Sequence, residues 1–263
     1  MKAWKPIFSG SWRHCVSAFV AAATLIMAVR AAAALPPPDV LPAEGGEIMV
    51  QPLQHATLGL RWKEHTVLVD PVGGAALFTN LPRPTLVLLT DIHGDHYQLS
   101  TLQALLTEKT LLVAPPAVTA QLPEALRSRT TTLTNGQSAV VGGVAVEAIA
   151  AYNLAEERQK FHPKGRGNGY VITLGGKRVY VSGDTEDIPE MRALQKIDVA
   201  FLCMNLPYTM TVEQAAEAVK AFRPRIVYPY HSRGSDLNRF KELLAGEKDV
   251  EVRLRNWYAT AGR

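Results

Sequence analysis

Four potential metal ligands lie within six residues of one another in the segment Thr90-Asp91-Ile92-His93-Gly94-Asp95-His96-Tyr97. They are two carboxylates and two imidazoles, a mixture that divalent transition metals bind well. The segment follows the apolar run Leu86-Val87-Leu88-Leu89, which predicts a buried strand. We expect an extended segment that projects residues 91, 93 and 95 to one side, with Gly94 allowing the turn that brings His96 to them. A solvated loop after a strand rarely concentrates so many ligands, so the pattern predicts a metal site.

Two further candidate ligands follow strand-like runs later in the chain. Asp184 follows Arg178–Val181, and His231 follows Ile226–Tyr228. Either residue alone would be typical of a turn aspartate or a surface histidine. Ligands at strand ends can converge on one sheet edge, where α/β proteins place their chemistry. The predicted metal ligands are therefore Asp91, His93, Asp95, His96, Asp184 and His231.

The elements that must position these residues are short strands with helices between them. Val212–Phe222 has apolar residues at helical spacing, with Thr211 as its N-cap. Two strand-rich halves with interspersed helices predict an α/β fold, a four-layer αββα sandwich with two central sheets. The expected strands are Ile48–Leu53, Thr57–Trp62, Thr66–Val69, Leu86–Leu89, Leu111–Val113, Ala139–Val141, Val144–Ala150, Tyr170–Leu174, Arg178–Val181, Val199–Leu202 and Ile226–Tyr228.

Residues 1–34 have the pattern of an export signal. A basic start is followed by the apolar stretch Cys15–Val29 and by four alanines at 31–34 that resemble a cleavage site. The apolar stretch is shorter than the roughly 20 residues of a spanning helix. Arg30 is atypical for a cleaved signal, so an uncleaved N-terminal membrane anchor remains the alternative. The pattern predicts a periplasmic or secreted protein with no stable membrane span once the signal is removed.

The rest of the chain is predicted to be a Pro-rich linker at 35–46 and one hydrolase domain at 47–263. The chain has 28 Lys and Arg against 24 Asp and Glu, and four of the basic residues lie within 1–34. The remainder is formally neutral, which argues against a nucleic-acid partner. Cys203 is the one cysteine after the predicted signal, so no internal disulfide is expected.

The order Asp91-x-His93-x-Asp95-His96, then Gly183-Asp184-Thr185 and His231, resembles the metallo-β-lactamase superfamily over residues 47–235. Gln54-His55-Ala56 is similar to the Gly-His-Ala segment of its lactonases and N-acyl phosphatidylethanolamine phospholipases D. The resemblance implies the αββα fold and a hydrolytic metal centre. It also implies that Asp184 bridges two ions where both bind, while Asp95 ligates metal and orients the attacking hydroxide as the catalytic residue.

Two departures from the family pattern weaken the first metal position. Asp91 stands where the family has histidine, and Asn153 stands where a further histidine is expected. A position poorer in imidazole is weaker toward zinc and more tolerant of manganese or iron. We expect one or two divalent ions, with zinc favoured. His162 could replace the missing ligand from a loop, and an exposed or substrate-facing histidine is the alternative.

Several other polar residues are candidates for substrate contact, and each has a plainer structural interpretation. His55 could instead be a hydrogen-bonded histidine at a strand start, Lys164 part of a mobile loop, and Tyr208 part of the core. Asp70 is expected to support the site as a carboxylate behind the ligands. The predicted substrate-binding set is His55, Asn153, His162, Lys164 and Tyr208.

These patterns predict an exported metal-dependent hydrolase acting on a small lactone, ester, amide or phosphodiester. A bound divalent ion lowers the pKa of water toward about 7 and polarises the bond under attack. Two alternatives stay open. One is a noncatalytic metal-binding or ligand-binding protein of the envelope. The other is a mononuclear iron enzyme of the same fold that oxidises thiols.

Overall fold

The computed structural model describes Met1 and residues 35–259. Apart from Met1, the predicted export signal lies outside the described residues. The first of two seven-stranded sheets pairs its strands in chain order, antiparallel from β1 to β4 and parallel from β4 to β7. Its strands are β1 (Asp39–Ala43), β2 (Gly46–Gln54), β3 (Thr57–Trp62), β4 (His65–Val69), β5 (Leu86–Leu88), β6 (Leu111–Ala114) and β7 (Thr130–Thr132).

The second sheet repeats this scheme. Its strands run antiparallel from β8 to β11 and parallel from β11 to β14. They are β8 (Ser138–Val141), β9 (Val144–Ala151), β10 (Gly167–Leu174), β11 (Lys177–Val181), β12 (Val199–Cys203), β13 (Ile226–Tyr230) and β14 (Glu251–Val252). The predicted strands are thus present, with small differences at their ends.

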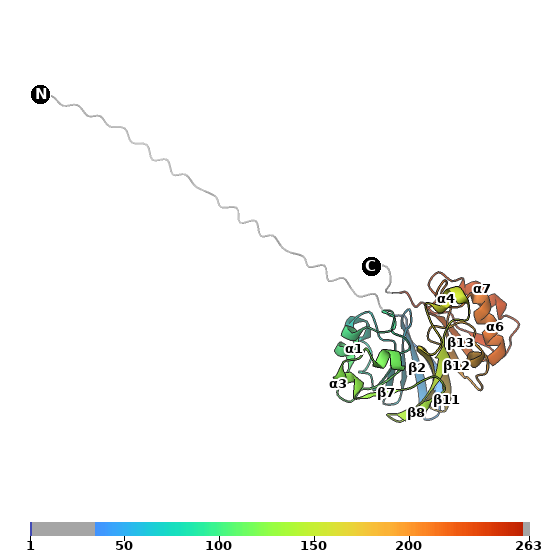
Figure 1. Cartoon of the computed structure of the whole chain (residues 1–263), viewed down its shortest axis with the longest axis horizontal. Coiled ribbons are helices and arrows are strands. Elements are labelled where there is room, and N and C mark those ends of the chain that lie inside the picture. The colour runs from blue at the N-terminus through green and yellow to red at the C-terminus, as the bar shows by residue number, and fades with distance from the viewer. Residues whose placement is uncertain (2–34, 260–263) are drawn as a thin grey trace. The chain divides into compact units, whose positions relative to one another are not determined.

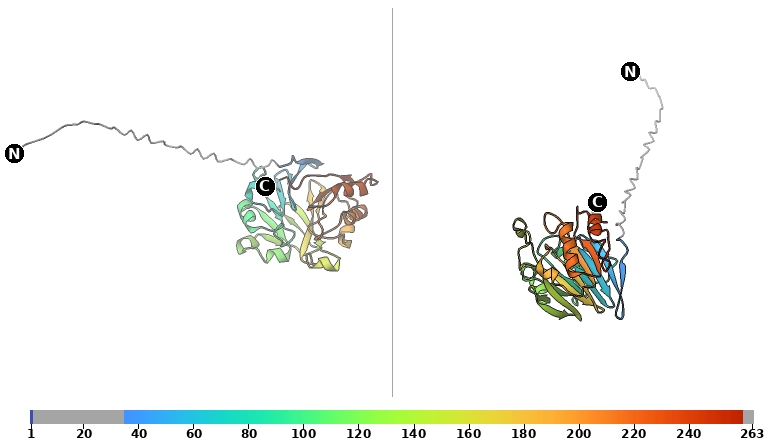
Figure 2. Two further views of the ribbon diagram at one scale, coloured as in Figure 1. Left: turned by 90° about the horizontal axis from the view of Figure 1, so that it is seen from above. Right: turned by 90° about the vertical axis from the view of Figure 1, so that its right-hand side faces the viewer.

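Helices cover the outer face of each sheet (Figure 1). The first sheet carries η1 (Ala75–Phe78), α1 (Leu99–Leu105), α2 (Pro116–Thr119) and α3 (Glu124–Arg127). The second half of the chain contains α4 (Glu156–Gln159), α5 (Pro189–Arg192), α6 (Val212–Phe222) and α7 (Leu237–Leu243). Figure 2 shows the same layers from two other sides. This arrangement confirms the predicted αββα sandwich.

The side chains of the parallel strands alternate between two hydrophobic cores. In β4, Val67 and Val69 join the larger core that the two sheets share, while Leu68 joins the core beneath α1. In β5, Leu88 joins the core between the sheets and Val87 joins the core beneath α1. A strand buried on both faces reads as a continuous apolar run, which is why the sequence marks it clearly. Both faces of these strands are therefore closed to water, and their polar residues gather where the strands end.

The N-terminal boundary differs from the prediction. Residues 39–43, expected within a linker, form β1 and pair with β2, so that Leu41 faces Ile48 in the core. Pro42 is tolerated because β1 is an edge strand. The carboxylate of Asp39 accepts a hydrogen bond from the Tyr228 hydroxyl at 2.8 Å. The folded part of the chain thus begins before residue 47.

Cys203 is free and buried. Within the part of the chain that the structure describes, no helix is both long and apolar enough to cross a membrane.

Candidate metal centre

The segment after β5 is a tight turn, and our expectation of an extended segment is wrong. The backbone N–H groups of His96 and Tyr97 both donate to the His93 carbonyl, at 3.0 and 2.8 Å. Gly94 does not adopt a positive φ, so the turn does not depend on glycine there. The turn directs Asp95 and His96 toward the second sheet, whereas His93 lies with Asp91. The six predicted ligands therefore fall into separate groups around one site.

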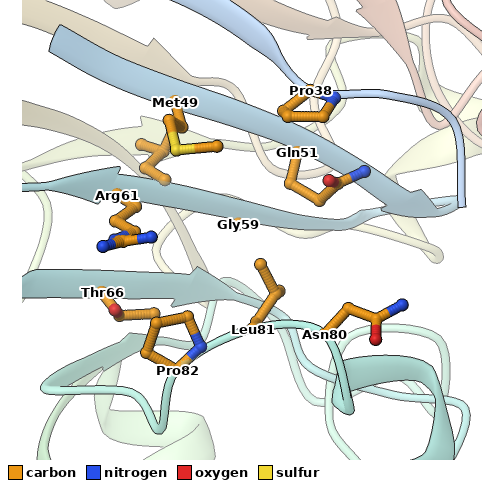
Figure 3. A pocket seen from close by; sticks show the side chains of 10 residues that line it. Pro38, Met49, Gln51, Gly59, Arg61, Thr66, Asn80, Leu81 and Pro82 are labelled. Carbon is orange, nitrogen blue, oxygen red and sulfur yellow. The ribbon is translucent and has the colours of Figure 1, made fainter.

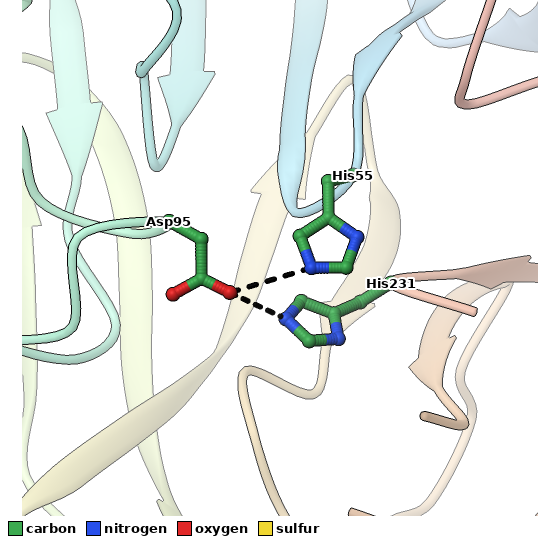
Figure 4. Close-up of side chains that lie close together, drawn as sticks. All are labelled: His55, Asp95 and His231. Carbon is green, nitrogen blue, oxygen red and sulfur yellow. Dashed lines mark hydrogen bonds and ion pairs between the residues drawn. The ribbon is translucent and has the colours of Figure 1, made fainter. Parts of the chain in front are cut away.

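The first group joins the two sheets. His55 follows β2, His231 follows β13, and the Nε2 atom of each lies 3.3 Å from Oδ2 of Asp95 (Figure 4). The backbone of both histidines is left-handed, with φ of 51° and 43°. Such a conformation costs about 1 kcal/mol or more in a residue that is not glycine and persists where the surroundings hold it. His55 thus sits among the candidate ligands, closer to the chemistry than the sequence indicated.

A second group centres on Asp184, which follows β11. One of its carboxylate oxygens lies 3.2 Å from His96 Nε2 and the other 3.4 Å from His231 Nε2. All three residues are buried. His162 Nε2 lies 3.1 Å from Asp184 as well, so Asp184 is within reach of three imidazoles. A third group contains Asp91, His93 and His162.

These groups fit a divalent ion by two criteria. Neighbouring ligands of a tetrahedral zinc ion bound at about 2.1 Å are about 3.4 Å apart, and the distances between candidate ligand atoms around Asp184 are 3.1 to 3.4 Å. In addition, Nε2 of His96, Nε2 of His162 and Oδ1 of Asp184 are buried without a hydrogen-bond partner. Buried polar atoms normally have partners, and an ion bound among these atoms would supply one.

The electrostatics keep the carboxylates ionised. Burial raises the pKa of Asp95, but hydrogen bonds from His231 and His55 outweigh it and hold that pKa well below its ordinary value. Burial opposes ionisation of Asp184 as well, yet His231 and His96 hold its pKa well below the usual range. Burial lowers the pKa of His96, but Asp184 and Asp70 raise it well above the usual range.

Asp70 supports His96 from behind, in the role that the sequence suggested. It is fully buried, and its Oδ2 lies 2.8 Å from His96 Nδ1. The Thr90 backbone N–H donates to the other oxygen at 2.8 Å. A carboxylate on Nδ1 orients the ring so that Nε2 faces the site, as in many metal-binding histidines.

Asp91 is predicted to be a metal ligand, and its side chain is already paired within the protein. Its buried carboxylate forms an ion pair with Arg166 at 3.1 Å, and the same guanidinium nitrogen lies 3.3 Å from His93 Nε2. One carboxylate oxygen also accepts the backbone N–H of Ile92 at 2.7 Å. A guanidinium therefore already stands beside the two residues that begin the motif, although both remain within reach of His162.

His162 lies among the candidate ligands. It is 2% exposed and its Nε2 faces Asp184. Asn153, which we expected to contact substrate, is buried behind it. The Asn153 amide donates to the Tyr208 carbonyl at 2.7 Å, and its backbone N–H donates to the His162 carbonyl at 2.9 Å. The structure thus places Asn153 outside the lining of the cavity beside the candidate ligands, where its amide nitrogen helps to hold the His162 loop.

Lys164 is also placed away from substrate. Its ammonium group pairs with Glu190 at 3.1 Å and lies over the Tyr152 ring. The structure thus places Lys164 outside the lining of the cavity that opens beside the candidate ligands.

A cavity of about 700 Å³ opens beside the candidate ligands. From the predicted set, its lining contains His55, His93, Asp95, His162, Asp184, Tyr208 and His231. It also contains Phe161, Asn205, Leu206, Pro207 and Arg233, which sequence reasoning missed because no local pattern marks them. Arg233, two residues after His231, could have been found only from that proximity.

A second hollow of about 230 Å³ lies on the outer face of the first sheet, over β2, β3 and β4 (Figure 3). Arg61 is the one charged residue of its lining. No carboxylate or imidazole accompanies it, so this hollow lacks the groups that bind metal or transfer protons.

Comparisons with known proteins identify the family of this chain. A family model described as a Beta-lactamase superfamily domain matches residues 49–231. A UPF0173 metal-dependent hydrolase of Thermoplasma acidophilum is 31% identical over 72% of this chain and 87% of its own length. A Parabacteroides distasonis structure described as a metal-dependent hydrolase is 36% identical, with a TM-score of 0.77 over 84% of this chain and 99% of its own.

A metallo-hydrolase structure from Ignicoccus hospitalis shares the fold at 21% identity, with a TM-score of 0.66 over 80% of this chain and 95% of its own. The matched region of the family model contains all six predicted metal ligands. The chain belongs to the β-lactamase superfamily and is a metal-dependent hydrolase of the metallo-β-lactamase fold.

Proposed function

We propose that the protein is an exported hydrolase that cleaves a lactone, ester, amide or phosphodiester bond in a small molecule with a divalent ion, zinc in the first place. The observation that carries this proposal is the set of buried, unpartnered ligand atoms around Asp184. They lie beside a cavity of about 700 Å³, a size typical of small-molecule sites.

The residues divide into two positions around Asp184. Asp95, His96 and His231 with Asp184 would hold the tighter ion, and His55 lies at the edge of this set. His93 and His162 would hold a second ion, with Asp184 between the positions. A divalent ion bound here would lower the pKa of water and polarise the bond under attack.

Asp95 has the geometry to orient the attacking water. Its side chain is 45% exposed, whereas that of Asp184 is 3% exposed. Asp95 is held by His55 and His231 through Oδ2, so Oδ1 is the oxygen that can accept a hydrogen bond from the pocket. This difference supports Asp95 as the catalytic residue.

Export rests on the pattern of residues 1–34. Mass spectrometry of the protein from its native host should find a chain that begins at about residue 34 or 35. An intact Met1 terminus in the soluble cytoplasmic fraction would contradict export, and an intact terminus in the membrane fraction would indicate the uncleaved anchor.

Membership in a family of metal-dependent hydrolases supports turnover over a noncatalytic binding role, and hydrolysis over thiol oxidation. The test is a metal-depleted protein reloaded with Zn²⁺, Mn²⁺ or Fe²⁺ and assayed on a lactone, an aryl ester, an amide and a phosphodiester. A glutathione-oxidation assay runs beside them.

We expect hydrolysis of at least one class by the loaded wild type, loss of that activity in Asp184→Asn, and no change in the control Lys164→Gln. Full metal loading without hydrolysis of any class would contradict the proposal. Glutathione oxidation by the iron form alone would favour the oxidising alternative.

A further inference from the structure

Arg233 lines the pocket beside the candidate ligands and is held in place by an aromatic ring. Its guanidinium carbon lies 5.3 Å from the centre of the Tyr258 ring. The Tyr258 hydroxyl accepts the Ser232 backbone N–H at 2.8 Å and lies 2.8 Å from His55 Nδ1. Arg233 is thus attached to the same contacts that position His55. Arg233 is exposed, and the contact with Tyr258 places its cation next to the site.

Among the described residues, no carboxylate forms an ion pair with Arg233, whereas Arg166 is paired with Asp91. The two carboxylates of the pocket lining, Asp95 and Asp184, both face histidine nitrogens instead. Arg233 is also the one arginine or lysine in that lining. A guanidinium in this setting is available to an anion that enters the pocket.

Another part of the lining is apolar. Leu206 and Tyr208 are 49% and 45% exposed, whereas most large apolar side chains of the described residues are buried. Tyr208 packs edge-on against the Phe161 ring at 5.0 Å between centroids, so this surface is ordered. Exposed apolar groups around a pocket with a few polar groups are typical of ligand contact.

We propose that the substrate carries a carboxylate or phosphate group next to an apolar body, and that Arg233 binds the anion while Leu206, Tyr208 and Phe161 contact the body. A guanidinium forms paired hydrogen bonds with either anion. The inference rests on the proposed hydrolytic function and names the substrate class for that same pocket.

The test is calorimetric binding to the zinc-loaded protein of three probes with the same phenyl body: 4-phenylbutyrate, 3-phenylpropyl phosphate and 4-phenylbutanol. Arg233→Gln should weaken binding of the two anions about tenfold and leave the alcohol unchanged, because a charge-assisted hydrogen bond is removed. Arg233→Lys should retain part of the anion affinity, since the charge remains without the planar fork. Leu206→Ser should weaken all three probes alike.

Lys164→Gln is the matched control, because that cation is paired with Glu190 outside the pocket. It should bind all three probes as the wild type does. Whichever of the two anionic probes binds more tightly to the wild type identifies the anionic group that the substrate carries.

Two results separate this inference from the proposed function. Equal affinity of Arg233→Gln and wild type for both anions, with hydrolysis intact, would overturn the inference alone. Absence of hydrolysis from the loaded wild type, with Arg233-dependent anion binding retained, would overturn the proposed function and leave the anion subsite standing.

Discussion

The backbone N–H of His231 donates to the carbonyl of His55 at 3.1 Å, and the two imidazole rings stack with their centroids 3.7 Å apart. His55 directly follows β2 of the first sheet, and His231 directly follows β13 of the second. This contact joins the two sheets where both rings reach Asp95. The site therefore depends on the two halves of the chain at once.

His55 is expected to act on the metal centre and not only on substrate. His55→Ala should reduce retained zinc and hydrolysis together, because it removes an imidazole that lies 3.3 Å from Asp95. Tyr258→Phe removes only the hydroxyl that contacts His55 Nδ1, and such supporting contacts change metal affinity about 10-fold to 100-fold when lost. Dialysis followed by elemental analysis measures both variants. Full zinc retention by His55→Ala would limit His55 to a substrate contact.

Asp70→Asn should weaken zinc binding without unfolding the protein. Asn keeps the size of Asp70 but not the charge that orients His96, so we expect a loss of about 10-fold to 100-fold in affinity. Competition with a fluorescent chelator measures the dissociation constant, and circular dichroism checks the fold. Unchanged zinc affinity in a folded variant would show that Asp70 is structural only.

Arg166→Gln should destabilise the metal-free protein by about 3 kcal/mol, because it leaves the buried Asp91 carboxylate unpaired. Zinc should restore much of that stability, since a divalent ion can then take the place of the guanidinium beside Asp91 and His93. Urea unfolding with and without zinc gives both values.

The control for this prediction is Lys220→Gln, which removes an exposed ion pair with Glu217 and should cost about 0.5 kcal/mol or less. If zinc did not restore the stability that Arg166→Gln loses, the guanidinium of Arg166 would not occupy the place of a divalent ion.

Chelation should lower the melting temperature of the wild type by several degrees, because an ion that binds only the native state stabilises it by mass action. Metal-free protein also keeps the ionised carboxylates of Asp95 and Asp184 close together, and a bound ion would offset their repulsion. Differential scanning fluorimetry before and after verified metal removal tests this. Identical melting temperatures would argue against a shared ion.

Strand ends could be read from the sequence because a strand buried on both faces appears as a continuous apolar run. Leu86–Leu89 marked the start of the metal motif in this way, and Asp184 and His231 were placed by the same reasoning. All six predicted ligands lie around one site for that reason.

Contacts between side chains on different loops could not be predicted from the sequence. Asn153 and His162 are nine residues apart in the sequence. The loop between them folds back toward the end of β9, so that His162 lies among the candidate ligands and Asn153 lies behind it. Asp91 and Arg166 are 75 positions apart in the sequence, and no local pattern predicts that they pair. The edge strand at 39–43 was hidden by the prolines around it, since proline is depleted from strands in general and tolerated at sheet edges.

The central claim is that an ion is held where the two sheets meet, by Asp184 with His96, His231 and Asp95. The most direct measurement is the zinc content per chain of wild type, Asp184→Asn, His231→Ala and the control His65→Ala after identical dialysis. His65 is the first residue of β4, stacked on Trp62 and away from the site. We predict that wild type and His65→Ala retain at least one zinc ion per chain and that the other two variants retain almost none. Equal zinc content in all four proteins would contradict the assignment.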